Sequence, residues 1–197
     1  MHLKQFIKKK NFGFENFLNL KEKKKTFFFE KKINLLQIEK KIKFRISKNQ
    51  NFIEYPMEGF HYLKDISKII KKNKGGLLLI DYGFSDWKMK NTLKGVSNHK
   101  FANILENLGT VDITHNINFN LFKKFINKFN GLKSNLTNQK NFLIKMGIKQ
   151  RAEIISKKHN FLKKDDIYYR LKRLIDEKQM GNLYKVMLIK HKDNNYN

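Results

Sequence analysis

Three consecutive residues, Asp81, Tyr82 and Gly83, are the ones best suited to do chemistry, and they follow the aliphatic run 77–80. A carboxylate can orient a cation, and the tyrosine and glycine that follow it can shape the loop beside the site. Ligands of open α/β sheets bind beyond the carboxyl ends of the strands. The three residues therefore predict a site at the end of a strand. The alternative is a plain strand-to-loop turn in which Gly83 supplies a positive φ.

A second set of polar groups is formed by His99, Asp112 and Thr114, which we interpret as substrate-site candidates together with Gly83. For these three residues a loop cap or a strand-end hydrogen bond is the competing interpretation. His99 and His115 are too far apart in sequence for the common metal-ligand spacings, so no metal site is predicted.

The apolar run 77–80, which directly precedes Asp81, has no polar interruption. Such a run is typical of a strand covered on both faces, in the interior of a parallel or mixed α/β sheet. A helix is predicted before it, because apolar residues recur with helical spacing after Pro56, at Phe60, Leu63, Ile66, Ile69 and Ile70. A helix that leads into a strand favours a parallel sheet.

The remaining elements are read from periodicity and turn residues. We expect strands over 3–7, 12–20, 26–29, 111–114 and 183–189, and helices over 103–108, 121–129, after 138, and after 165 with Asp165 as N-cap. Residues 1–190 form one predicted domain, with a β-rich insertion at about 8–55 and an α/β part at 57–190. Residues 191–197 are predicted to be a disordered tail.

The chain has 197 residues and a formal net charge of +26, which suggests a surface that binds phosphate. Nearly all of this charge is lysine, since only four residues are arginine. Proteins that recognise phosphates and bases rely on the bidentate guanidinium group of arginine, so we do not expect a nucleic acid as partner. Abundant Lys, Asn, Ile and Phe is what an AT-rich genome would produce without any ligand.

Several function classes lack their sequence signatures. No apolar run approaches 18 residues, which predicts no membrane span, and the start lacks the apolar stretch of a signal peptide. With no cysteine there is no disulfide framework and no thiolate metal site. Neither a glycine-rich nucleotide loop nor a serine nucleophile elbow is present.

Short motifs in order along the chain nevertheless resemble one family. They are Gly75-Gly76, Ile80 to Gly83, Thr92-Leu93, His99, Gly109, Asp112 to Thr114, Asn118-Phe119, Phe142-Leu143, Gly147-Ile148, Arg151 and Met180 to Val186. Together they resemble the C-terminal half of the MidA-type S-adenosylmethionine-dependent methyltransferases, whose mitochondrial members act as arginine methyltransferases in complex I assembly. The resemblance spans Gly75 to Val186, and more loosely reaches back to Leu3.

The resemblance implies a class I, Rossmann-like sheet of which this chain holds the C-terminal part. In the family a glycine-rich cofactor loop, an acidic residue and an Asn-Glu-Phe-Phe-Asp-Ala-type segment precede the point that corresponds to Leu3. The resemblance therefore implies a fragment, a split gene product or a mis-called start, so that no cofactor-binding residue can be named. The family's His and Asp near Thr114 appear here as Asn116 and Asn118.

By the same resemblance, we expect transfer of a methyl group from S-adenosylmethionine to a protein arginine, with a respiratory complex I subunit as the candidate acceptor. Asp81 and Tyr82 are the catalytic candidates, and this chain alone is expected to bind the cofactor weakly. The compartment implied is the bacterial cytoplasm or, alternatively, the mitochondrial matrix. The rival hypotheses are a basic nucleic-acid-binding protein and a non-catalytic assembly partner, in which an oligomer partner or a missing N-terminal half covers an open sheet edge.

Overall fold

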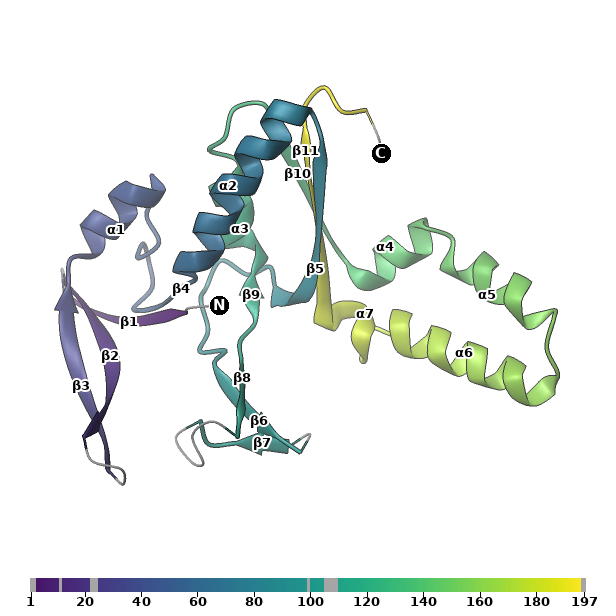
Figure 1. Ribbon diagram of the computed structural model, residues 1–197, viewed down its shortest axis with the longest axis horizontal. Coiled ribbons are helices and arrows are strands. Elements are labelled where there is room, and N and C mark those ends of the chain that lie inside the picture. Colours follow the sequence, from purple (N-terminus) through teal and green to yellow (C-terminus); the bar gives the residue numbers. More distant parts are fainter. Residues whose placement is uncertain (1–2, 11, 22–24, 99, 105–109, 196–197) are drawn as a thin grey trace. The chain divides into compact units, whose positions relative to one another are not determined.

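The computed structural model describes residues 3–10, 12–21, 25–98, 100–104 and 110–195 (Figure 1). It divides into two compact units, Met1–Ser67 with Asp86–Asn116 and Lys68–Ser85 with Ile117–Asn197. Each unit has its own strands and its own buried apolar residues. The division of the chain into an insertion, an α/β part and a tail stays a prediction.

The first unit begins with an antiparallel sheet in the order β3-β2-β1-β4. Its strands are β1 (Lys4–Lys9), β2 (Phe12–Lys21), β3 (Lys25–Ile33) and β4 (Phe52–Tyr55). The strands expected near 3–7, 12–20 and 26–29 are thus confirmed. Within the stretch expected to be β-rich, α1 (Leu35–Ile42) is a helix, because the Asn34 side chain caps its first turn and Leu35 and Ile42 are buried.

The aromatic core of this unit lies between β1, β4 and the start of α2 (Met57–Asn73). The Phe6 and Tyr55 rings stack with centroids 6.1 Å apart, and Phe60 packs on Tyr55 at 5.5 Å. Phe6 and Phe60 are 1% and 2% exposed. The helix predicted after Pro56 is confirmed, and its apolar spacing serves this core.

A second sheet of the first unit pairs in the order β7-β6-β8. It consists of β6 (Lys94–Ser97), β7 (Lys100–Ala102) and β8 (Asp112–Thr114). The strand expected over 111–114 is confirmed. Most of the helix expected over 103–108 lies outside the described residues.

The second unit is built on a mixed sheet in the order β10-β11-β5-β9. Its strands are β5 (Gly76–Phe84), β9 (Ile117–Asn118), β10 (Leu132–Asn138) and β11 (Tyr184–His191). β11 is antiparallel to both neighbours, and β5 and β9 are parallel through Gly83 and Phe84. The aliphatic strand thus lies inside the strand order of a mixed α/β sheet, as expected, although β9 covers only Gly83 and Phe84 of its second edge.

The expectation that this strand is covered on both faces is wrong. Leu78, Ile80 and Tyr82 are 46%, 44% and 41% exposed, while the residues between them are half-buried. The reason is that helix α3 (Phe119–Ile126) packs against β5, β10 and β11 and buries the opposite face, which contains the fully buried Met187 and Ile189. A continuous apolar run does not reveal that one of its faces lies open.

The polypeptide between β10 and β11 forms a helical arm that leads away from the sheet and returns (Figure 1). Its helices are α4 (Gln139–Lys145), α5 (Ile148–Ser156), α6 (Phe161–Ile175) and α7 (Met180–Leu183). The prediction that Asp165 caps a helix is wrong, because α6 begins earlier and the Asn160 side chain accepts from the backbone N–H of Lys163. β11 extends to His191, whose N–H donates to the carbonyl of Gly75.

Candidate functional site

Asp81 lies near the carboxyl end of β5, with its carboxylate turned back onto the chain. Its Oδ1 accepts a hydrogen bond from the backbone N–H of Tyr82 at 2.7 Å. Asp81 thus makes a strand-end hydrogen bond, which is the structural alternative to a functional role for this residue. A carboxylate has further lone pairs beyond this one bond, so the site role of Asp81 stays a prediction.

Gly83 allows a close approach between β5 and the start of α3. A Cβ atom at this position would lie 2.6 Å from Cε2 of Phe119 and closer still to the carbonyl oxygen of Ile117. Contacts this short are not tolerated, so glycine is needed here to bring β9 against β5. The space beside Gly83 is therefore filled by the chain itself.

Tyr82 lies opposite Tyr184 of β11, and the two ring centroids are 4.1 Å apart. Burial, followed by a hydrogen bond with Tyr82 and by the negative charges that Tyr82 (when ionised) and Asp81 place nearby, raises the pKa of Tyr184 to about 12, although the positive charge of Arg173 opposes the shift. Tyr184 therefore keeps its proton far above neutral pH. The end of β5 thus groups two phenols, a carboxylate and an arginine.

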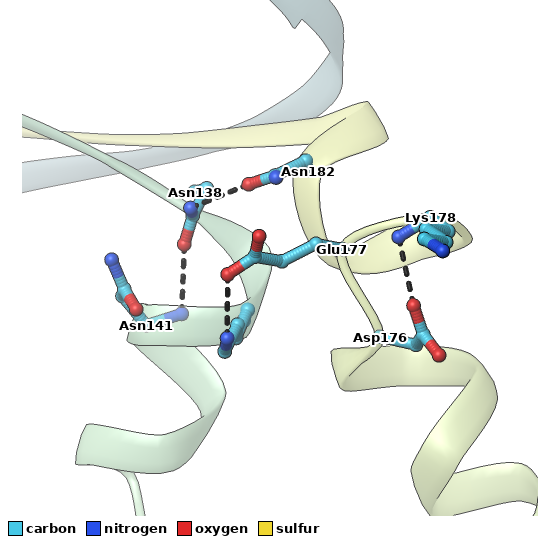
Figure 2. Close-up of polar contacts among 7 residues, drawn as sticks. Asn138, Asn141, Asp176, Glu177, Lys178 and Asn182 are labelled. Carbon is cyan, nitrogen blue, oxygen red and sulfur yellow. Dashed lines mark hydrogen bonds and ion pairs between the residues drawn. The ribbon is translucent and has the colours of Figure 1, made fainter.

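Polar contacts at the base of the helical arm hold Tyr184 in place. Figure 2 shows Asn138, whose Oδ1 caps α4 through the N–H of Asn141 at 2.8 Å and whose Nδ2 donates to Asn182 at 2.7 Å. Nearby, the ammonium of Lys140 pairs with Glu177 at 2.6 Å. These contacts tie the start of α4 to the turn that leads into β11, two residues before Tyr184.

The other candidates lie in the first unit. Asp112 and Thr114 are exposed and belong to β8, where Asp112 pairs with Val96 and Thr114 with Lys94. His99 lies outside the described residues. The structure therefore brings Asp81, Tyr82 and Gly83 together at one strand end, and places Asp112 and Thr114 on a separate, short sheet.

Sequence reasoning missed a buried carboxylate in the first unit, Glu54 of β4, which is 6% exposed. Its Oε1 accepts from Nε2 of Gln5 and from the N–H of Thr92, both at 2.9 Å, and its Oε2 accepts from the Thr92 hydroxyl at 2.7 Å. The Thr92 hydroxyl in turn accepts from the N–H of Asn116 at 3.1 Å. Glu54 thus joins β1, β4 and the loop before β6.

The signal for this network was an acid inside an otherwise apolar strand, between Ile53 and Tyr55. A buried acid needs hydrogen-bond partners, but a sequence does not show which distant residues will supply them. Gln5 and Thr92 could not be selected from the many other polar residues.

An apolar groove lies over the open face of the second unit's sheet and has a volume of about 580 Å³. Its floor includes Leu78, Val186 and Leu188, and one wall is formed by Phe142 and Met146 of the helical arm and its following turn. Lysines 145 and 190 also line it. None of the described residues that line the groove is acidic.

Neither a metal centre nor a membrane span is found among the residues that the structure describes. Over the described ranges, no group of three or more His, Cys, Asp or Glu side chains is arranged to hold a metal ion. Among the same residues, no helix has both the length and the apolar character needed to cross a bilayer.

Comparison with known proteins places these features in context. A model of the family described as putative S-adenosyl-L-methionine-dependent methyltransferase matches residues 1–137. The chain is 26% identical over 124 residues to the protein arginine methyltransferase NDUFAF7, mitochondrial, of Xenopus tropicalis, covering 62% of this chain and 28% of the relative. For the Danio rerio protein of the same name the identity is 22% over 138 residues, covering 70% and 32%.

Two solved structures from Burkholderia thailandensis have a similar fold. One, an uncharacterised protein, has a TM-score of 0.75 at 19% identity, with 97% of this chain and 52% of that chain covered. The other, a likely methyl transferase bound to S-adenosyl-homocysteine, has a TM-score of 0.74 at 18% identity, covering 97% and 50%. The chain therefore spans about half the length of these structures and less than a third of the length of the curated relatives.

Proposed function

Because the chain belongs to the family of putative S-adenosyl-L-methionine-dependent methyltransferases, we propose that it forms the acceptor side of a protein-arginine methyltransferase. The family match confirms the MidA-type resemblance found in the sequence. The arginine acceptor is supported by the names of the relatives from Xenopus tropicalis and Danio rerio, at low identity.

The observation that carries the proposal is the grouping of Asp81 with the contacting rings of Tyr82 and Tyr184 near the carboxyl end of β5. An arginine guanidinium is a planar cation with several N–H donors, and it favours carboxylates and aromatic faces. Asp81 would accept hydrogen bonds from the guanidinium and hold one nitrogen in a fixed orientation. The two tyrosine rings would add aromatic contact area beside it.

The described residues do not themselves fit the cofactor of the family. S-adenosylmethionine carries a positively charged sulfonium and a ribose whose hydroxyls are bound by acids in nucleotide sites of this kind. The apolar groove is lined by Lys145 and Lys190 and by no acid among the described residues, and the space beside Gly83 is occupied by the chain. We therefore expect weak binding of S-adenosylmethionine in calorimetry with this chain alone.

Protein methylation in the host cell tests the proposal. Disrupting the gene should remove methylation from at least one arginine detected by mass spectrometry of whole-cell protein, and the wild-type gene should restore it. Asp81→Asn should restore it at least about tenfold less well, because a neutral amide holds a guanidinium less strongly. Asp86→Asn is the matched control, since Asp86 is exposed and pairs only with Lys90 in the described contacts.

Unchanged arginine methylation in the disrupted strain would contradict the proposal. Full restoration by Asp81→Asn would remove Asp81 from the site while leaving the activity. Asp112 and Thr114 are tested in the same assay as further substrate-site candidates, together with His99.

The partner and the location are part of the same proposal. The acceptor would be a protein, and the family resemblance favours a subunit of respiratory complex I. Two solved relatives come from a bacterium and the curated ones are named mitochondrial, so we propose the bacterial cytoplasm, with the mitochondrial matrix as the alternative. A non-catalytic assembly role is the second candidate, favoured by the exposed apolar side chains of β5, since Leu78 and Ile80 are 46% and 44% exposed.

A further inference from the structure

The tip of the helical arm presents two neighbouring apolar side chains to solvent. Helix α5 ends at Ser156 and α6 begins at Phe161, and the turn between them lies at the end of the arm that is farthest from the sheet (Figure 1). Phe161 and Leu162 are 74% and 77% exposed. Single exposed apolar residues are common on protein surfaces, but an adjacent, almost fully exposed pair on a projecting turn needs an explanation.

Phe161 and Leu162 are the first two residues of α6, and this position sets their direction. The Cα–Cβ bonds of a helix tilt toward its N-terminus, so the side chains of the first turn lean past the start of the helix. The start is fixed by Asn160, whose side chain accepts from the backbone N–H of Lys163 at 3.2 Å. Both apolar side chains therefore lean toward the tip of the arm.

The turn itself is held by hydrogen bonds. The N–H of Lys158 donates to the carbonyl of Ile155 at 3.2 Å, and the N–H of His159 donates to that of Ser156 at 3.1 Å. The buried hydroxyl of Ser156 also lies 3.4 Å from the hydroxyl of Tyr168, which joins α5 to α6 close to the turn. The tip is thus a formed surface that keeps Phe161 in place.

Four lysines surround the apolar pair within the segment 157–164, which contains no acid. Lys157 and Lys158 precede the pair, Lys163 and Lys164 follow it, and all four are exposed. The first turn of α6 contains no acidic residue either. Lysines in that turn do not stabilise the helix, because the helix dipole favours negative charge there.

An apolar pair surrounded by positive charge matches the surface of an anionic lipid bilayer. Aromatic and aliphatic side chains enter the boundary between head groups and acyl chains, while lysines keep their ammonium groups at the lipid phosphates. A projecting tip enters a bilayer without needing a complementary cavity, which a folded protein partner would have to provide. A nucleic acid would use the charges but would leave Leu162 in water.

We propose that the arm tip, residues 157–164, binds the surface of anionic lipid bilayers. Phe161 and Leu162 enter the bilayer boundary, and the four lysines contact the phosphates of the head groups. The arm thereby attaches the second unit to a membrane surface from one side. This inference rests on the tip alone and is independent of the arginine acceptor proposed above.

Vesicles of phosphatidylcholine mixed with anionic phosphatidylglycerol should bind the whole chain in co-sedimentation. Combining Phe161→Ser with Leu162→Ser should weaken this binding at least about tenfold, because the buried apolar groups supply part of the affinity. Tyr62→Ser with Ile69→Ser is the matched control, since these residues of α2 are also exposed, at 65% and 58%. The control pair should bind like the wild type.

A second pair of variants separates the tip from the total charge of +26. Changing the four tip lysines to Gln should weaken binding at least about tenfold, since each lysine close to an anionic surface strengthens binding about fivefold. The control changes four exposed lysines of α1 and α2 to Gln and removes the same charge; they are Lys40, Lys41, Lys71 and Lys72. It should weaken binding less than about threefold, because these lysines stay farther from the lipid than a Debye length.

A fluorescent probe reports whether the tip enters the lipid. Trp87 is the only tryptophan of the chain, so Phe161→Trp in a Trp87→Phe background places the single indole at the tip. Its emission should shift to the blue when anionic vesicles are added, because the ring leaves water. Tyr62→Trp in the same background should show no shift.

Wild-type binding by the variant that lacks Phe161 and Leu162 would overturn the proposal. Equal losses from the two lysine sets would do the same, because the vesicles would then respond only to total charge. Displacement by inorganic phosphate, beyond that caused by chloride at the same ionic strength, would indicate a site for a single anion and would also contradict it. Arginine methylation in cells is read out separately, so this inference and the proposed function can fail independently.

Discussion

At the scale of single residues, the candidate site is decided by neighbours that the sequence does not show. The order Asp81, Tyr82, Gly83 was enough to predict that a strand ends nearby, but β5 includes all three residues and continues to Phe84. The close approach at Gly83 was not predicted, and Gly83 does not take the positive φ expected of a turn. The residue order could not show that Asp81 bonds to the next amide or that Tyr82 lies against Tyr184, about a hundred residues away in the chain. Such pairing depends on the register between β5 and β11.

Tyr82→Phe should lower the pKa of Tyr184 from about 12, since it removes the hydrogen bond and the nearby charge while burial remains. Because folding raises the pKa of Tyr184, this residue's contribution to the stability of the folded state is fully present below the ordinary tyrosine pKa near 10. The contribution is lost as the pH rises to about 12. The measurement is an NMR titration of ¹³C-labelled tyrosine between these values. Tyr62→Phe, at an exposed position of α2, should leave the pKa of Tyr184 unchanged.

Gly83→Ala should lower the free energy of unfolding by about 1–3 kcal/mol, because the new methyl group would overlap Phe119 and the Ile117 carbonyl. Gly75→Ala is the control, since no heavy atom lies within 4 Å of a Cβ there. Urea unfolding compares the two variants. Equal stability of both would show that β9 can move away from β5 at little cost.

At the scale of elements, periodicity predicted most helices and strands and failed where a single face or cap decides. The uninterrupted run of β5 suggested cover on both faces, but apolar composition is the same whether the cover is present or absent. Asp165 and Asn160 are both good capping residues, and only the backbone geometry selects Asn160. The groove over β5 was not predicted, because it depends on the open face and on the helical arm.

The network around Glu54 should contribute strongly to the stability of the first unit. Glu54→Gln keeps the shape of the side chain but places an N–H₂ group against donors, which should cost about 1–3 kcal/mol of unfolding free energy. Glu30→Gln breaks only an exposed ion pair with Lys9 and should cost less than about 1 kcal/mol. A loss of the same size in both variants, measured by urea unfolding, would rule out a special role for the buried network.

At the scale of the whole molecule, the charge of +26 is the most conspicuous property and the least informative about chemistry. It comes almost entirely from lysines, which are spread over both units. The family match over residues 1–137 and the similar fold of the two Burkholderia thailandensis structures are more informative than this charge, because they identify the family and the fold.

If the lysines are a compositional feature, binding to RNA or duplex DNA should be weak and unselective, and it should fall by decades between low and moderate salt. Fluorescence anisotropy with a labelled oligonucleotide measures this. Tight binding that depends on sequence and persists at physiological salt would favour the nucleic-acid hypothesis over methyl transfer.

Helix α6 has no buried residue along its length, and Phe161, Leu162 and Tyr169 are all more than two thirds exposed. Helices in proteins owe most of their stability to tertiary packing, so this one should open more often than the sheet. It also contains several lysines and arginines, after which trypsin cleaves. Digestion should therefore begin in the arm and leave a nicked molecule whose strands β5, β10 and β11 stay associated.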